Sequence, residues 1–352
     1  DYVWQTLGLG MSYRVAINGY GRIGQAVLRA IYERGLENQL VPVAINELSD
    51  IDTVSYLTRY DTTHGRFPRS VRVEKPNLVV DEQPIRILRE EQIDSLPWSE
   101  LDVDLLFECS GSFSDRETAE RHLNSGAKRL LFSQPARSDV DATIIAGLNQ
   151  TELKAEHKIV SAASCTTNAI IPVLSLLHEA FGIEQGLTTT VHSAMNDQPV
   201  IDAYHHTDLR LTRSALQSII PVDTSLDKGI DRLLPELSGR FKCLHLRVPT
   251  INVSLMDMSI TLSRETTEAE VNALLQHASQ GALKGYLGYT EEPHASVDFN
   301  RDRHSSVIDA TQTRVSGGKL LKVICWFDNE WGFANRMLDV AERWLEIQPN
   351  SK

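Results

Sequence analysis

The feature that most constrains the fold is a set of three glycines at positions 19, 21 and 24. They follow residues 14–18, an apolar run typical of a strand, and precede residues 25–34, where apolar residues continue at helical spacing from Ile23. In a strand, turn and helix of this kind, the first glycine makes the tight turn, the second lets the backbone approach a pyrophosphate, and the third packs the helix on the strand. We therefore expect a dinucleotide-binding corner, the alternative being a glycine-rich turn of an unrelated α/β domain.

An acidic residue follows the next apolar run, residues 41–46, about 20 positions after the glycines. Glu47 stands where a carboxylate would accept a hydrogen bond from a ribose 2′-hydroxyl. A 2′-phosphate would be repelled there. The sequence thus predicts NAD rather than NADP as the cofactor.

The pattern of the first half predicts an α/β fold with a doubly wound parallel sheet. Short apolar runs alternate with helical or polar segments, which favours parallel strands. Residues 71–88 hold three β-rich pieces broken by turn residues, so we expect an antiparallel excursion there. Further strands are predicted at residues 103–109, 129–133 and 143–146.

The second half predicts an α+β domain with a mixed, mainly antiparallel sheet. Residues 187–192, 244–248 and 253–263 are longer alternating strands with few helices between them. Residues 329–347 form an amphipathic helix. A chain of 352 residues also exceeds what one hydrophobic core usually holds, so two domains are expected.

Charge and composition exclude several classes of function. The net charge of −12 disfavours nucleic-acid binding, so an anionic substrate would need a local cluster of arginines. No apolar run reaches the roughly 20 residues that a membrane helix requires. The four cysteines show no Cys-x-x-Cys spacing, which indicates neither a metal site nor a disulfide framework and fits a reducing cytoplasm.

One cysteine stands out as a candidate nucleophile. Cys165 precedes an apolar helical segment, and a helix start favours thiolate over thiol, which predicts a pKa below about 8.5. Pro172 should kink that helix or loosen its first turns. For the other three cysteines a buried apolar role is expected.

His192, at the end of a predicted strand, is the candidate base. A strand end can hold a catalytic side chain both fixed and accessible. Eleven histidines are present, however, and His205 with His206 is an equally visible pair, best interpreted as a solvated turn. Spacing alone does not single out His192.

The chain carries four motifs in order: INGYGRIG at 17–24, SCTTN at 164–168, RVPTINV at 247–253 and WFDNEWG at 326–332. Together they resemble the glyceraldehyde-3-phosphate dehydrogenase family over most of the chain. The resemblance implies a homotetramer and an NAD-binding Rossmann domain over residues 11–164, to which residues 330–349 return. It implies a catalytic domain over residues 165–329. Residues 1–10 are interpreted as a remnant outside both domains.

The resemblance also implies the roles of individual residues. Cys165 resembles the family's nucleophile, His192 its base, and Asn329 the residue that orients the nicotinamide carboxamide. The remaining cofactor residues implied are Asn18, Gly19, Gly21, Arg22, Ile23, Gly24, Glu47 and Ser133. The substrate-binding residues implied are Ser164, Thr166, Arg210, Thr224, Ser225 and Arg247, and no metal is expected.

Departures from the family's usual pattern lie where phosphate is held. Met195 stands where a threonine is usual, residues 221–225 replace a Thr-Thr-Gly type of loop, and Asp197 and Asp223 bring negative charge. This combination resembles the branch known as D-erythrose-4-phosphate dehydrogenase, which feeds pyridoxal phosphate synthesis. It implies a thioester released by water rather than by inorganic phosphate.

Two alternatives stay open at this stage. The first is a phosphorylating glyceraldehyde-3-phosphate dehydrogenase of glycolysis. The second is an NAD-binding regulatory protein without activity, although such a protein has no need of Cys165, His192 or Asn329.

Overall fold

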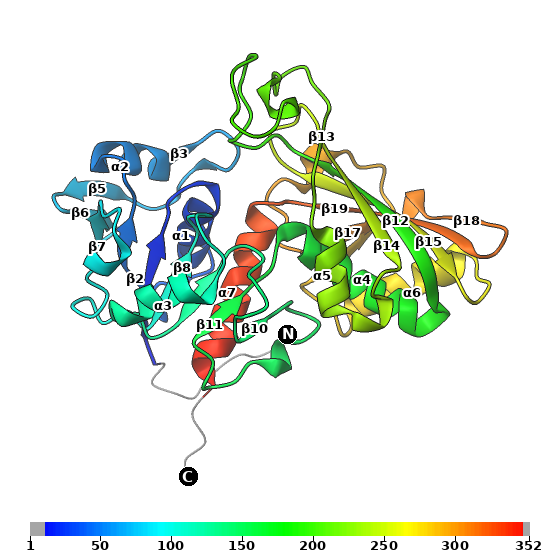
Figure 1. The fold of residues 1–352 in the computed structure, drawn as a ribbon, viewed down its shortest axis with the longest axis horizontal. Coiled ribbons are helices and arrows are strands. Elements are labelled where there is room, and N and C mark those ends of the chain that lie inside the picture. Colours follow the sequence, from blue (N-terminus) through cyan, green and yellow to red (C-terminus); the bar gives the residue numbers. More distant parts are fainter. Residues whose placement is uncertain (1–10, 348–352) are drawn as a thin grey trace, which may run out of the picture. The chain divides into compact units, whose positions relative to one another are not determined.

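A computed structural model describes residues 11–347, and the chain divides into two compact units (Figure 1). Among the described residues, the first unit comprises residues 11–142, 153–161 and 337–347. The second comprises residues 143–152 and 162–336. The interpretation of residues 1–10 as a remnant, and residues 348–349 of the predicted first domain, lie outside the described residues.

The first unit is built on a nine-stranded sheet with the order β10-β11-β9-β8-β1-β2-β7-β6-β5. Neighbouring strands from β11 to β7 run parallel, whereas β5, β6 and β7 pair antiparallel, which confirms the excursion predicted at residues 71–88. The strands are β1 (Tyr13–Asn18), β2 (Leu40–Asn46), β5 (Val71–Glu74), β6 (Asn77–Val80), β7 (Gln83–Leu88), β8 (Leu105–Glu108), β9 (Leu130–Phe132), β10 (Ala142–Thr143) and β11 (Ile159–Ser161). The helices are α1 (Arg22–Glu33), α2 (Ile51–Arg59) and α3 (Arg116–Asn124), and a small ribbon pairs β3 (Tyr60–Asp61) with β4 (Gly65–Arg66).

The strand predicted at residues 143–146 is wrong beyond its first residue. β10 ends at Thr143, and turns follow it. The Asn149 side chain accepts a hydrogen bond from the Ile145 N–H at 2.7 Å and donates one to the Thr143 carbonyl at 3.0 Å. A local side-chain bond to the backbone thus replaces the strand ladder here.

The end of the last helix, α7 (Trp331–Glu346), belongs to the first unit from Met337 onward. The Tyr13 hydroxyl donates to the Leu345 carbonyl at 2.8 Å, and Arg34 pairs with Asp339 and Glu342 at 2.9 and 2.7 Å. These contacts attach α7 to β1 and to the end of α1.

The second unit is built on an eight-stranded sheet with the order β13-β14-β12-β15-β19-β17-β16, and β18 pairs with β19. Only β12 with β14 and β16 with β17 pair in parallel, so the mixed, mainly antiparallel sheet that we predicted is confirmed. The strands are β12 (Ile183–His192), β13 (Ile220–Val222), β14 (Phe241–Arg247), β15 (Ser254–Leu262), β16 (Leu287–Thr290), β17 (Ser306–Asp309), β18 (Arg314–Ser316) and β19 (Leu320–Phe327). The helices within this unit are α4 (Cys165–Phe181), α5 (Leu226–Leu233) and α6 (Glu268–Gln280).

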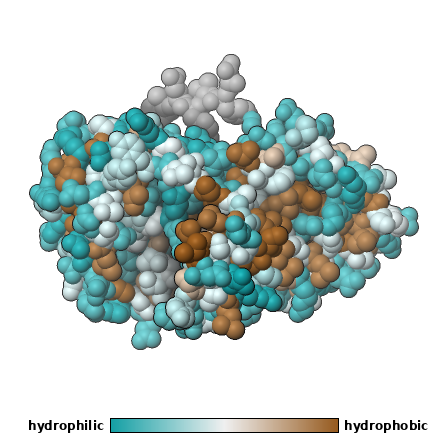
Figure 2. All heavy atoms as spheres, turned by 90° about the horizontal axis from the view of Figure 1, so that it is seen from above, coloured by the Kyte–Doolittle hydropathy of each residue, from teal (hydrophilic) through white to brown (hydrophobic). Residues whose placement is uncertain are grey.

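One face of this second sheet carries the unit's core. Along β15, buried residues such as Met256 and Met258 alternate with half-buried ones, and they pack in one apolar cluster with Leu174 of α4. On the other face, Leu187 of β12 and Leu244 of β14 are exposed. Figure 2 shows apolar side chains, coloured brown, gathered in patches on the face of the molecule that it draws.

Short 3-10 turns complete the two units, at Ile93–Ser95, Gln150–Glu152, Arg210–Thr212, Pro235–Leu237, Ser296–Phe299 and Ala310–Gln312. Among the helices of residues 11–347, none has both the length and the apolar character needed to cross a membrane.

Candidate active site

Cys165 is the first residue of α4, where the local sequence fixes the start of the helix. Ser164 is the N-cap, and its Oγ accepts a hydrogen bond from the Thr167 N–H at 3.1 Å. Ala163, just before the cap, has φ of 58°, a left-handed conformation that costs a residue with a side chain about 1 kcal/mol or more. Strain of this size is common beside functional groups, and here it sets the direction in which the chain enters the helix.

The helix continues through Pro172 from Cys165 to Phe181 without a break. The loosened first turns that we predicted are therefore not found, and a kink at Pro172 stays a prediction. The first turn is tied to the preceding loop by Asn168, whose Nδ2 donates to the carbonyls of Ala162 and Ser164 at 2.9 and 2.8 Å.

His192 closes β12 and faces the cysteine. Its Nε2 lies 3.9 Å from Cys165 Sγ, and its Nδ1 lies 2.8 Å from the Ser193 carbonyl oxygen. Because a carbonyl only accepts, Nδ1 carries the proton, which leaves the lone pair of Nε2 directed at the sulfur. The pair thus has the arrangement of a thiol and its base.

Burial sets the charge state of both groups. It raises the pKa of the Cys165 thiol to about 12, although hydrogen bonds from the backbone N–H groups of Thr166 and Cys165 act in the opposite direction. Burial also lowers the pKa of His192, while its hydrogen bond to Ser193 partly offsets this. The helix start does act on the thiol, but the lowered pKa predicted from it is wrong because desolvation outweighs it.

Asn329 is held by two hydroxyl groups that the sequence did not reveal. Its Oδ1 accepts hydrogen bonds from Ser193 Oγ at 3.1 Å and from Ser254 Oγ at 3.0 Å, which leaves the amide nitrogen as its donor end. The neighbouring Asp328 is buried, and its Oδ1 accepts from the Trp331 N–H at 2.7 Å at the start of α7. An aspartate three residues before a helical run is a capping signal that sequence analysis can use.

Arg247 lies next to His192 because the parallel register of β12 and β14 pairs these two residues. Its guanidinium is nearly buried and forms an ion pair with Asp197 at 2.6 Å. The positive charge of Arg247 therefore lies beside His192, and the negative charge of Asp197 partly neutralises it.

The other predicted anion-binding residues differ in how close they lie to Cys165 and His192. Thr166 Oγ1 lies 2.9 Å from Ser164 Oγ, so these two hydroxyls flank the cysteine. Thr224 Oγ1 accepts from the Leu226 N–H at 3.2 Å, and Ser225 is exposed at the start of α5. Arg210 is exposed in a 3-10 turn, and within residues 11–347 no hydrogen bond or ion pair links it to Cys165 or His192.

The three glycines of the first unit have three different surroundings. A Cβ on Gly19, whose φ is 87°, would lie 2.5 Å from Ser110 Cα, and a Cβ on Gly24 would collide with the Gly19 carbonyl oxygen. Around Gly21 the space is open, with no atom within 4 Å of a Cβ placed there. This open space at the start of α1 is the cradle that a pyrophosphate requires, since the first backbone N–H groups of a helix bind phosphates.

A pocket of about 460 Å³ adjoins the glycine turn within the first unit. Its lining includes Asn18, Glu47 and Phe113. Glu47 directly follows β2, and its carboxylate accepts from the Tyr20 N–H at 3.0 Å and the Ser49 N–H at 3.2 Å, so its direction is fixed. These residues fit an adenosine and its ribose hydroxyl groups.

Three further predicted cofactor residues lie inside the first unit. Arg22 begins α1 and pairs with Asp61. Ile23 follows it in the first turn. Ser133 comes directly after β9, and its side chain bonds to the Cys109 thiol. In the described part of the chain, no three His, Cys, Asp or Glu side chains gather in a way that would hold a metal ion.

Comparison with known families matches both halves of the chain. Residues 13–116 match the family described as "Glyceraldehyde 3-phosphate dehydrogenase, NAD binding domain". Residues 164–329 match "Glyceraldehyde 3-phosphate dehydrogenase, C-terminal domain". The first match contains the glycine turn and Glu47, and the second contains Cys165, His192 and Asn329.

Proposed function

The chain belongs to the glyceraldehyde 3-phosphate dehydrogenase family and binds NAD, and we propose that it oxidises D-erythrose 4-phosphate to 4-phospho-D-erythronate. The observation that carries the chemistry is the 3.9 Å contact between Cys165 Sγ and the unprotonated Nε2 of His192. That contact supports an acyl thioester as the intermediate.

The first step follows from the charge states of the pair. Cys165 is a neutral thiol in the resting chain, because its pKa is raised to about 12. His192 Nε2 therefore takes the thiol proton as the sulfur attacks the aldehyde carbon. The backbone N–H of Cys165 at the helix start and the resulting imidazolium stabilise the oxyanion that forms.

Bound NAD supplies the hydride acceptor for the oxidation. His192 Nδ1 stays bonded to the Ser193 carbonyl, so the ring keeps its orientation while Nε2 exchanges protons. Once the aldehyde carbon has been oxidised to the thioester, Nε2 gives the thiol proton to solvent and is again a base. It then takes a proton from a water molecule as the water oxygen attacks the thioester carbon. The carbon–sulfur bond breaks, the acid is released, and the departing Cys165 sulfur recovers a proton from Nε2.

The residues around Cys165 and His192 support erythrose 4-phosphate as the substrate and water as the group that attacks the thioester. Met195 is half-exposed and offers no hydroxyl donor, and Arg247 is already paired with Asp197. Position 195 thus offers no hydroxyl to an anion, and Asp197 offsets the charge of Arg247. A second, inorganic phosphate would be held weakly there, which supports hydrolysis and a role in supplying pyridoxal phosphate synthesis.

The alternative is phosphorylating glyceraldehyde-3-phosphate dehydrogenase activity, which the names of both matched families favour. Steady-state rates with the two aldehydes, each with and without inorganic phosphate, separate the two functions. We expect NADH formation from erythrose 4-phosphate without phosphate. Strict dependence on phosphate, or a clear preference for glyceraldehyde 3-phosphate, would refute the proposed function in favour of the alternative.

We further propose a homotetramer in the cytoplasm. Support for assembly comes from the outer face of the second sheet, where Leu187 and Leu244 are exposed on adjacent strands, because apolar residues on an open sheet face are typical of subunit contacts. Light scattering coupled to gel filtration measures the mass in solution. A stable monomer would contradict this part of the proposal.

A further inference from the structure

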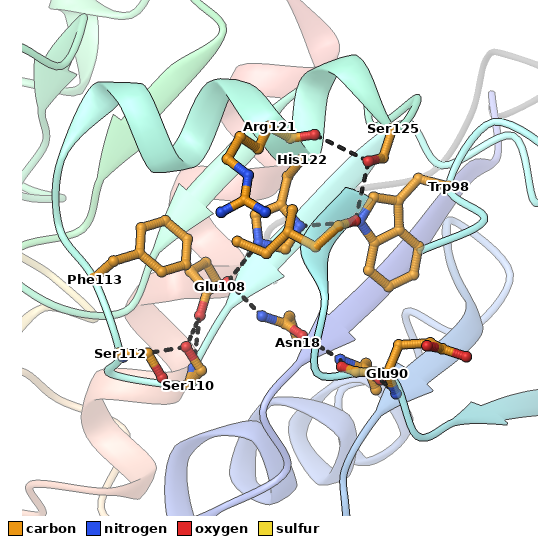
Figure 3. A network of polar contacts seen from close by, with 12 residues as sticks. Asn18, Glu90, Trp98, Glu108, Ser110, Ser112, Phe113, Arg121, His122 and Ser125 are labelled. Carbon is orange, nitrogen blue, oxygen red and sulfur yellow. Dashed lines mark hydrogen bonds and ion pairs between the residues drawn. The ribbon is translucent and has the colours of Figure 1, made fainter. Parts of the chain in front are cut away.

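A buried carboxylate that the proposed mechanism does not use lies behind the cofactor pocket. Glu108, at the end of β8, is 1% exposed, and Figure 3 shows it at the centre of a polar network. A carboxylate that is this deeply buried is costly unless donors surround it. The donors around Glu108 are therefore informative about its purpose.

Each oxygen of Glu108 is directed at a residue of the pocket wall. Oε2 accepts from Asn18 Nδ2 at 2.7 Å, and Oε1 accepts from the Ser110 N–H at 2.8 Å and from the Ser110 hydroxyl. Asn18 ends β1 and Ser110 follows β8, and both line the 460 Å³ pocket. The carboxylate thus bonds the ends of two adjacent parallel strands at the point where the cofactor loops leave the sheet.

Behind the carboxylate stands a second buried group. The indole N–H of Trp98 donates to His122 Nδ1 at 3.1 Å, so the proton of the neutral imidazole is on Nε2, which lies 3.4 Å from Glu108 Oε2. The His122 ring stacks on Phe113, with centroids 5.6 Å apart, and Phe113 also lines the pocket. Burial lowers the pKa of His122 to about 4, so the ring is neutral at pH 7.

The network extends across the pocket floor to the next strand. Asn18 Oδ1 accepts from Asn46 Nδ2 at 2.8 Å, and Asn46 Oδ1 accepts from the Glu90 N–H at 2.9 Å. Asn46 and Glu90 line the same pocket. The side chains therefore form one hydrogen-bonded series, in which removal of the central acceptor leaves buried donors unpaired.

We infer that Glu108 is a positioning residue of the NAD site, whose buried carboxylate holds Asn18 and Ser110 in the pocket wall. It acts through these residues and touches no reacting atom. The pocket that it shapes lies within the first unit, so the adenosine half of the cofactor is the part whose binding depends on it.

The test replaces Glu108 with glutamine, which keeps the size but has a single acceptor oxygen. Whichever way the amide turns, its NH2 group faces a donor, so we expect a rise of roughly 10-fold in the Kd of NAD, which corresponds to about 1.4 kcal/mol. Calorimetric titration of the Glu108→Gln protein with NAD, and with ADP-ribose, which lacks nicotinamide, measures the effect. We expect both ligands to weaken by the same factor.

A matched control separates positioning from general stability. Val103→Ala removes two methyl groups from a buried position of the same unit, two residues before β8 begins, and should lower the melting temperature without changing the Kd. The inference is overturned if Glu108→Gln binds NAD like the unchanged protein, if only NAD and not ADP-ribose weakens, or if Val103→Ala weakens NAD equally.

A second variant covers failure of Glu108→Gln to fold. Ser110 is exposed, and Ser110→Ala removes one hydroxyl donor from the same carboxylate. A severalfold rise in the Kd of NAD is expected. An unchanged Kd in Ser110→Ala would overturn the inference independently.

Discussion

Acidification should destabilise the first unit through His122. Burial lowers the pKa of this side chain from 6.5 to about 4, so between these values the unfolded chain binds a proton that the folded chain does not. Stability therefore falls as the pH falls through this window. Integrated from pH 7 to pH 5, a shift of this size removes about 2 kcal/mol of the free energy of unfolding.

Urea denaturation at pH 7 and pH 5, with the unchanged protein and His122→Gln, measures this contribution. The variant lacks the contribution of His122 to the pH dependence. Between pH 7 and pH 5 its free energy of unfolding should therefore fall by about 2 kcal/mol less than that of the unchanged protein. His206→Gln, at an exposed histidine, is the matched control and should leave the pH dependence intact. Equal pH dependence in the unchanged protein and His122→Gln would refute the reasoning.

Further predictions concern the catalytic pair and the glycine turn. Cys165→Ala should abolish turnover but keep NAD binding in a titration; substantial remaining activity would exclude the thioester. His192→Asn should lower kcat by about 10² to 10⁴, and in the unchanged protein kcat/KM should rise with pH only below 6.5, because burial lowers the pKa of His192. Gly24→Ala should lower the melting temperature, since its Cβ meets the Gly19 carbonyl, whereas Gly21→Ala has room and should chiefly weaken NAD binding. Equal loss of stability in both glycine variants would contradict these assignments.

Periodicity and turn chemistry predicted the fold class because both are local. The glycine turn, the excursion at residues 71–88 and the mixed second sheet could all be read from residue spacing. The end of β10 could not, because it depends on one asparagine side chain that bonds to the backbone around it. Nor could the two hydrogen bonds by which the Asn168 side chain ties the first turn of α4 to the preceding loop.

The sequence and its family resemblance supplied the candidate site residues, but they did not predict the energetics of these residues. The position of Cys165 at a helix start was predicted and is confirmed. The direction of its pKa shift was not, because it depends on burial by segments that are distant in the sequence. The side chains of Ser193 and Ser254 both bond to Asn329. Ser193 follows β12, Ser254 begins β15 and Asn329 follows β19, so the pairing of these strands brings the three residues together. The spacing of residues around Glu108 did not reveal the network, because Asn18 lies 90 residues away in the sequence and His122 is on another element.

The central claim, a thioester on Cys165 that water releases, is tested most directly by rapid acid quenching during turnover followed by mass spectrometry. With NAD and erythrose 4-phosphate in a buffer free of phosphate, we predict a phosphoerythronyl group on the peptide that contains Cys165, together with 4-phosphoerythronate as the product. Turnover with no acyl group on Cys165, or with the acyl group on another cysteine, would contradict the account, as would an adduct that persists until inorganic phosphate is added.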